Sequence, residues 1–68
     1  MKATSGRELG RILQQHGWTL SRVTGSHHIY TKAGARVHLS VPMHSNKPLK
    51  TGTLRALLKA AGLTESDL

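Results

Sequence analysis

Two adjacent histidines, His27 and His28, follow a glycine–serine pair at positions 25–26 and lead into Ile29-Tyr30. A histidine titrates near neutral pH, so its imidazole can take a proton from a ribose 2′-hydroxyl or give one to a leaving oxygen. Cleavage of a phosphodiester without a metal then needs positive charge at the phosphate, where negative charge builds up. The pair therefore has three interpretations: proton-transfer groups, metal ligands, or ordinary polar residues of a strand.

The surrounding residue types argue against a metal site. The chain has 5 histidines, no cysteine and 3 acidic residues, and these acids lie far away in sequence, at positions 8, 65 and 67. Adjacent histidines do not have the i, i+4 spacing on a helix with which zinc proteases hold their metal. No acid stands near enough in sequence to orient a histidine in a Ser–His–Asp arrangement. We therefore expect no metal and no cofactor.

Positive charge is the strongest feature of the composition. Lys and Arg number 10 against 3 Asp and Glu, which gives a net charge of +7 over 68 residues. Such an excess attracts polyanions, of which nucleic acid is the commonest. The basic residues are spread from Lys2 to Lys59 without a block, which indicates a basic face on a folded domain rather than a disordered arm. The cations considered for contacts with phosphate are Arg22, Arg36, Lys47, Lys50 and Arg55.

A single domain over residues 1–68 is expected, since the sequence has neither an internal repeat nor a linker. The absence of cysteine excludes disulfides and thiolate zinc sites. No apolar run approaches the ~20 residues that cross a bilayer, and no signal peptide is visible at the N-terminus. We expect a soluble, cytoplasmic protein with no membrane partner.

Two amphipathic helices are predicted, one near each end of the chain. Ser5 and Glu8 have the spacing of a capping box, and the apolar pattern that follows predicts a helix over residues 6–16. Leu54 begins a second i, i+3, i+4 apolar pattern, and Gly62 is its natural end.

The start of the second helix is a candidate anion site. Lys50 and Thr51 stand there, with Thr51 as the expected N-cap, and free backbone N–H groups and the helix dipole favour a phosphate. Arg55 and Lys59 lie four residues apart on one helical face and extend the basic surface along the helix. The same residues have a simpler interpretation as an ordinary cap and a solvated face.

Three strands are predicted between the helices, over residues 18–23, 27–31 and 36–41, and Pro42 ends the third because proline cannot donate to a ladder. The element order is α-β-β-β-α. The simplest way to bury both helical stripes is an antiparallel three-stranded sheet with the two helices on one face, which leaves the opposite face open. This α+β layout is that of a compact double-stranded-RNA-binding domain.

Strand alternation sends His27 and His28 to opposite faces of the sheet, so they cannot act together on one phosphate. Alternating Val and Leu residues in the third strand predict which of its side chains face inward. A three-residue loop over residues 33–35 sets the pairing of the two strands, and so predicts which side chains of the second strand share that inner face. Ile29 then faces inward, and His28 and Tyr30 face outward. His27 shares the inner face at the rim of the sheet. Pattern alone therefore favours His28 as the proton-transfer group and leaves His27 open as the alternative.

Four segments together resemble a known family. They are Gly17-Trp18, GSHH at 25–28 followed by Ile29-Tyr30, VPMHS at 41–45, and LKTGTLRALLKAAGLT at 49–64. In this order they are similar to HicA, the small toxin of the HicBA toxin–antitoxin modules of bacteria and archaea, over about Ser5 to Leu68. The resemblance implies a fold like that of a double-stranded-RNA-binding domain. It also implies a metal-independent endoribonuclease (an mRNA interferase) that cleaves mRNA and so inhibits translation, as part of a stress response.

The resemblance further implies site residues. The family's catalytic histidine follows the Gly-Ser turn, which maps to His27 and disagrees with the choice of His28 from alternation. We follow the resemblance and predict His27 as the general acid–base, with His28 and Ser26 as candidate helpers. For the binding of RNA phosphates we predict Arg22, Lys50, Thr51 and Arg55.

A HicB antitoxin is the partner that the resemblance implies. It would form a hetero-oligomeric complex with this chain, cover the active site and carry the DNA-binding function with which the pair represses its own operon. Because the chain has only 3 acidic residues, we expect an acidic surface on that partner. Two alternatives remain at this point: a non-catalytic RNA-binding module of the same fold, which would leave RNA intact, and a structural protein associated with the ribosome.

Overall fold

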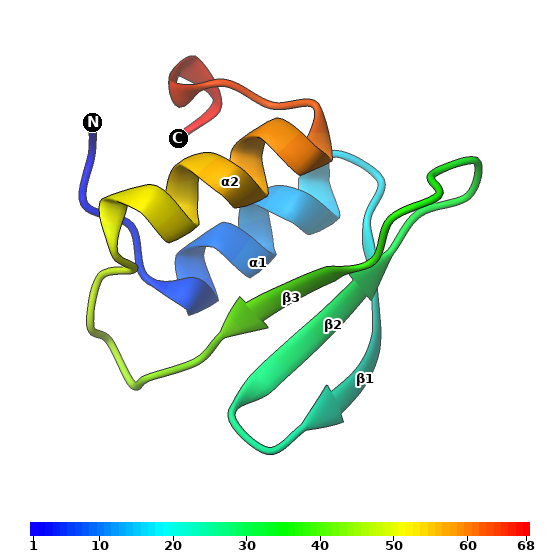
Figure 1. Ribbon diagram of the computed structural model, residues 1–68, viewed down its shortest axis with the longest axis horizontal. Helices are drawn as coiled ribbons and strands as arrows, with labels where there is room; N and C mark the ends of the chain where they lie inside the picture. The colour runs from blue at the N-terminus through cyan, green and yellow to red at the C-terminus, as the bar shows by residue number, and fades with distance from the viewer.

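The sheet has three antiparallel strands in the order β1-β2-β3, and two helices cover one of its faces (Figure 1). The computed structural model describes residues 1–68, and its elements are α1 (Gly6–Gln15), β1 (Thr19–Thr24), β2 (His27–Thr31), β3 (Leu39–Pro42), α2 (Thr51–Ala61) and a 3₁₀ turn, η1 (Glu65–Asp67). The predicted α+β class and the order α-β-β-β-α are confirmed. The face of the sheet away from the helices is open, as predicted.

The two helices begin in different ways. At α1 the predicted capping box is present: the Glu8 N–H donates to the Ser5 hydroxyl and the Ser5 N–H donates to the Glu8 carboxylate, both at 3.1 Å. At α2 the N-cap is Lys50, whose extended backbone (φ −60°, ψ 143°) precedes the helix and whose side chain makes no capping bond. The prediction of Thr51 as the N-cap was therefore wrong by one residue. No side chain caps the N–H groups at the start of α2.

One hydrophobic core lies between the helices and the sheet. Its buried members are Leu9, Leu13, Trp18, Tyr30, Leu39, Val41, Leu54 and Leu58. Two glycines let α1 approach the sheet closely, because a Cβ on Gly6 would overlap the carbonyl oxygen of Pro42 and a Cβ on Gly10 would overlap the hydroxyl of Tyr30. This close approach accounts for glycine inside a helix, where it costs ~1 kcal/mol relative to alanine.

The connection between β2 and β3 is longer than predicted. β3 begins at Leu39 rather than at residue 36, so the connection covers residues 32–38, and Val37, which the pattern places in the core, is 47% exposed. A three-residue loop would pair Tyr30 with His38, whereas the structure pairs Tyr30 with Leu39. The register therefore differs by one residue from the predicted one.

This shift of one residue reverses the predicted faces, since it moves every side chain of a strand to the other side of the sheet. His28 pairs with Val41 of the core, and Tyr30 is only 4% exposed beneath α1. His28 and Tyr30 thus lie on the helix side, and His27 and Ile29 lie on the open face. The outward position predicted for His28 and Tyr30 was wrong, because the aromatic ring of Tyr30 buries more apolar surface than Ile29 does.

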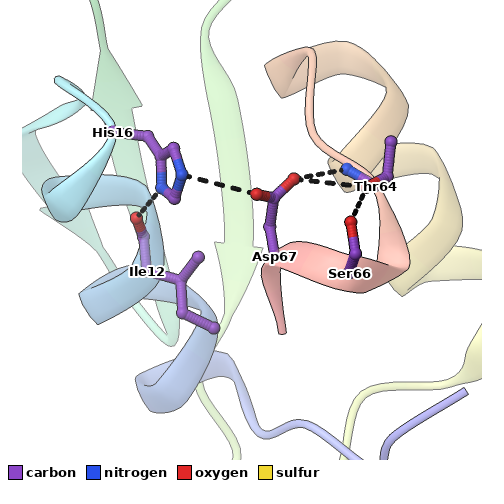
Figure 2. A network of polar contacts seen from close by, with 5 residues as sticks. All are labelled: Ile12, His16, Thr64, Ser66 and Asp67. Atoms are coloured by element: carbon purple, nitrogen blue, oxygen red, sulfur yellow. Dashed lines mark hydrogen bonds and ion pairs between the residues drawn. The ribbon is translucent and has the colours of Figure 1, made fainter.

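The C-terminal turn is tied to the end of α1 by a contact between His16 and Asp67, which is an ion pair when the imidazole is protonated (Figure 2). His16 Nε2 lies 3.6 Å from Asp67 Oδ1, and the Nδ1–H of the same ring donates to the carbonyl of Ile12 at 2.9 Å. The Asp67 carboxylate also accepts a hydrogen bond of 2.8 Å from the Thr64 N–H, which caps the turn. An ion pair this exposed contributes on the order of 0–1 kcal/mol.

Candidate functional site

His27 is the first residue of β2, and its exposed side chain lies on the open face of the sheet. It has a strand on each side, because it pairs with Thr24 of β1 and with Pro42 of β3. The turn before it is tied to the segment after β3, since the Met43 N–H donates to the Ser26 carbonyl at 2.6 Å. The imidazole is therefore held on a fixed backbone and remains accessible to a large substrate.

Arg22 shares the open face with His27 because of an irregularity in β1. The pairing register shifts between Leu20 and Arg22, which is a β-bulge. Regular pairing onward from Leu20 would place Arg22 opposite His28 on the helix side, whereas the bulge places it opposite Ile29. Arg22 and His27 are thus diagonal neighbours of an antiparallel pair, a relation that separates the residues by roughly 7–8 Å. Both side chains therefore lie on the same accessible face of the sheet.

His28 lies on the helix side of the sheet, in a groove of about 550 Å³ between α1 and strands β1 and β2. Arg7 and Arg11 of α1 line this groove, and Tyr30 contributes to its strand side. His28 itself is half-buried. Although they are adjacent in sequence, His27 and His28 therefore belong to two different surfaces of the molecule.

A second hollow, of about 520 Å³, lies where the chain passes from β3 into α2. Lys50 lines it together with His44 and Lys47, and Pro42, the pairing partner of His27, forms part of its wall. Figure 1 shows the β1–β2 turn and the segment between β3 and α2 at the same end of the sheet. The structure therefore brings Lys50 to the end of the sheet that carries His27.

The other predicted site residues are Ser26, Thr51 and Arg55, and they lie in three different parts of the structure. Ser26 is exposed in the β1–β2 turn, and Thr51 is the exposed first residue of α2. Arg55 lines a separate hollow further along α2, which it shares with Lys59. The structure does not place Arg55 in the hollow of Lys50.

Three basic residues of these surfaces were not singled out from the sequence: Arg7, Arg11 and His44. The i, i+4 spacing of Arg7 and Arg11 is a visible signal, because it puts two side chains on one face of a predicted helix. His44 belongs to the VPMHS segment that contributes to the family resemblance, but no spacing pattern marks it as a site residue, since it lies in an irregular segment whose path depends on tertiary contacts.

No acidic side chain lines the groove of His28 or the hollow of Lys50, whereas Glu65 lines the separate hollow of Arg55. The hydrogen bond from the Ser5 N–H lowers the pKa of Glu8 below its usual value of 4.5, and this bond holds the carboxylate at the start of α1. Asp67 is engaged at the C-terminal turn, and its contact with His16 is the only ion pair in the chain. The cations at both faces of the sheet therefore have no acidic partner within the protein.

No three His, Cys, Asp or Glu side chains gather into a group that could hold a metal ion. None of the helices has the length and apolar character needed to cross a membrane.

The fold and the site together define a small, strongly basic α+β domain with an exposed histidine and unpaired cations at one end of its sheet. A family model for the HicA toxin of bacterial toxin–antitoxin systems matches residues 6–63, and the chain therefore belongs to the HicA toxin family. No curated protein matches the chain. Membership makes this chain the toxin of a toxin–antitoxin system and implies an antitoxin partner.

Proposed function

We propose that this toxin is a metal-independent endoribonuclease that cleaves mRNA and so inhibits translation, with His27 as its general acid–base. The observation that carries the proposal is the diagonal pairing of His27 with Arg22 on the open face. A proton-transfer group and a fixed positive charge on one accessible surface are the two requirements for cleaving RNA without a metal.

The reaction that fits these groups is attack by the ribose 2′-hydroxyl on the adjacent phosphorus. The 2′-oxygen loses its proton and forms a bond to phosphorus. The bond from phosphorus to the 5′-oxygen breaks, and the leaving 5′-oxygen gains a proton. His27 transfers a proton in this sequence, and Arg22 stabilises the negative charge that builds on the phosphate. The products are a 2′,3′-cyclic phosphate and a 5′-hydroxyl.

The remaining predicted residues bind RNA or support His27. Lys50 and the uncapped N–H groups at Thr51 hold a neighbouring phosphate, as helix starts do for anions. Arg55 extends this basic surface along α2. Ser26 supports His27 through the turn that precedes it.

The antitoxin partner is proposed to be a HicB protein that covers the open face in a hetero-oligomeric complex and supplies the DNA-binding function of the pair. An acidic contact surface would match the unpaired cations of this chain. The cytoplasm is the compartment in which mRNA and such an antitoxin would be met.

End-group analysis of the RNA products tests the proposed chemistry. The purified chain is incubated with RNA in excess EDTA, and the new ends are identified by their reactivity with phosphatase and polynucleotide kinase. We expect cyclic phosphates and 5′-hydroxyls, at a rate that EDTA does not lower. Ends that carry a 5′-phosphate would rule out attack by the 2′-hydroxyl. RNA that stays intact while bound would instead support a non-catalytic RNA-binding module.

A further inference from the structure

We infer that the groove on the helix side of the sheet, between α1 and strands β1 and β2, is a second binding site for the phosphate backbone of RNA. This inference rests on the proposed function for the identity of the ligand. The groove has a volume of about 550 Å³, and the residues that matter for it are Arg7, Arg11, Gln14, His28, Tyr30 and Ser45.

The positive charge of the groove is the first feature that favours phosphate binding. Arg7 and Arg11 are one helical turn apart, so that both guanidinium groups emerge from the same face of α1. Neither arginine forms an ion pair, and no acidic side chain lines the groove. Arg11 does contribute to lowering the pKa of nearby Glu8, but that carboxylate is hydrogen-bonded to Ser5. Guanidinium groups bind phosphate oxygens in a planar, bidentate way, which makes this pair suited to an RNA backbone.

The shape of the groove follows from the contact of α1 with the sheet. Gly10 lies on the same helical face as Arg7 and Arg11, and its missing side chain lets the Tyr30 hydroxyl come against the helix backbone. Tyr30 thereby fills the space beneath α1, and the groove opens beside it toward β1, which is exposed along its whole length.

Hydrogen-bonding side chains complete the lining. Gln14 continues the Arg7–Arg11 face of α1 by one more turn, and His28 adds a half-buried imidazole from the opposite wall. Ser45 lies at the far side with a φ of 55°, and it is the only residue other than glycine in the left-handed region. Donors thus reach the groove from three separate segments of the chain.

RNA fits the groove better than an acidic protein segment does, because the groove borders the His27 site. His28 lines the groove and the next residue toward the turn, His27, lies on the open face. A single RNA strand that passes around the β1–β2 turn would therefore present one of its phosphates to the arginines and another to His27. The regular repeat of phosphates along RNA satisfies two such positions at once.

Binding of a fully 2′-O-methylated RNA tests the inference, since this RNA lacks the nucleophilic hydroxyl and cannot be cleaved by the proposed 2′-hydroxyl attack. The double variant Arg7→Gln/Arg11→Gln is compared with the control Lys2→Gln/Arg36→Gln, which removes the same charge from residues outside the groove. All four side chains are exposed, so both variants keep the fold, as amide NMR spectra would verify.

We expect the groove variant to bind the RNA at least 10-fold more weakly than the control variant at equal salt. The slope of log K against log salt concentration should fall by ~0.7 for each phosphate contact that is lost from single-stranded RNA. Equal affinity of the two double variants would overturn the inference. A groove variant that keeps its RNA affinity but no longer binds poly-glutamate would overturn it too, in favour of a protein-binding groove.

The outcome is independent of the proposed ribonuclease activity. If the toxin leaves ordinary RNA intact but the groove variant still loses affinity, the proposed function fails and the second RNA site stands. If ordinary RNA is cleaved and the two double variants bind alike, the proposed function stands and the second site fails.

Discussion

Gly10 in α1 lies so close to the hydroxyl of Tyr30 in β2 that no side chain fits between them. This contact accompanies the burial of Tyr30 on the helix side of β2. Because side chains alternate along a strand, it also determines that His27, three residues earlier, lies on the open face. The position of the proposed catalytic residue thus depends on a glycine in a helix.

The first prediction concerns this contact. We expect Gly10→Ala to destabilise the fold by about 1–3 kcal/mol, because the new Cβ would overlap the Tyr30 hydroxyl. Gly52→Ala is the matched control, since no atom lies within 4 Å of its added Cβ and alanine is preferred to glycine in a helix by ~1 kcal/mol. Urea unfolding of both variants measures the difference. A stabilised Gly10→Ala variant would contradict the close packing.

The second prediction concerns the pH dependence of stability. The folded-state pKa of Glu8 is lowered from 4.5, chiefly by the hydrogen bond from the Ser5 N–H, so its contribution to stability is present above pH 4.5 and is lost as the pH falls through the lower folded value. Glu8→Gln keeps the capping geometry without the charge and should flatten this acid limb. Thermal unfolding between pH 2 and 7, a range that extends about two units on either side of 4.5, measures the effect. Glu65→Gln is the control, and an unchanged acid limb in Glu8→Gln would refute the assignment.

The third prediction concerns Arg22. If its guanidinium stabilises charge on the phosphate in the transition state, Arg22→Gln should lower kcat by ~10²-fold, as the loss of one such donor does elsewhere, and change KM little. Arg36→Gln removes the same charge from the exposed connection between β2 and β3 and should leave kcat within about twofold of the wild type. Single-turnover cleavage separates the two effects. A rise in KM alone would make Arg22 a binding residue.

The fourth prediction concerns the hollow at the start of α2. Lys50→Gln should raise KM and reduce the salt dependence of RNA binding by ~0.7 in the log–log slope, because one phosphate contact is lost. Its kcat should not change, since Lys50 lies beyond Pro42 and away from the reacting bond. Lys59→Gln, in the separate hollow of Arg55, is the control of equal charge. An equal effect of the two substitutions would indicate a general effect of net charge.

Both helices could be predicted from the sequence because their signals are local. The capping box of Ser5 and Glu8 and the glycine at position 62 lie within a few residues of the helix ends that they define. The number and order of the strands could also be predicted, since the turn at residues 25–26 separates the first two strands and Pro42 ends the third.

The faces of the strands could not be predicted, because they depend on contacts between segments that are distant in sequence. The register of β3 follows from a connection over residues 32–38 that has no short-turn signal, and a shift of one residue was enough to exchange His27 and His28. Arg22 lies on the face of His27 only because of a bulge in β1, and no residue type in β1 predicts that bulge. The resemblance to HicA pointed to His27, whereas alternation had pointed to His28.

Cleavage of RNA by histidine variants in excess EDTA shows whether His27 is the general acid–base. Wild type, His27→Ala, His28→Ala and the control His38→Ala, an exposed histidine outside the strands, are compared at saturating RNA. We expect His27→Ala alone to lose at least ~10²-fold in rate, the usual contribution of a general acid–base. Loss of activity in His28→Ala with an active His27→Ala would contradict it and move the catalytic site to the groove beneath α1.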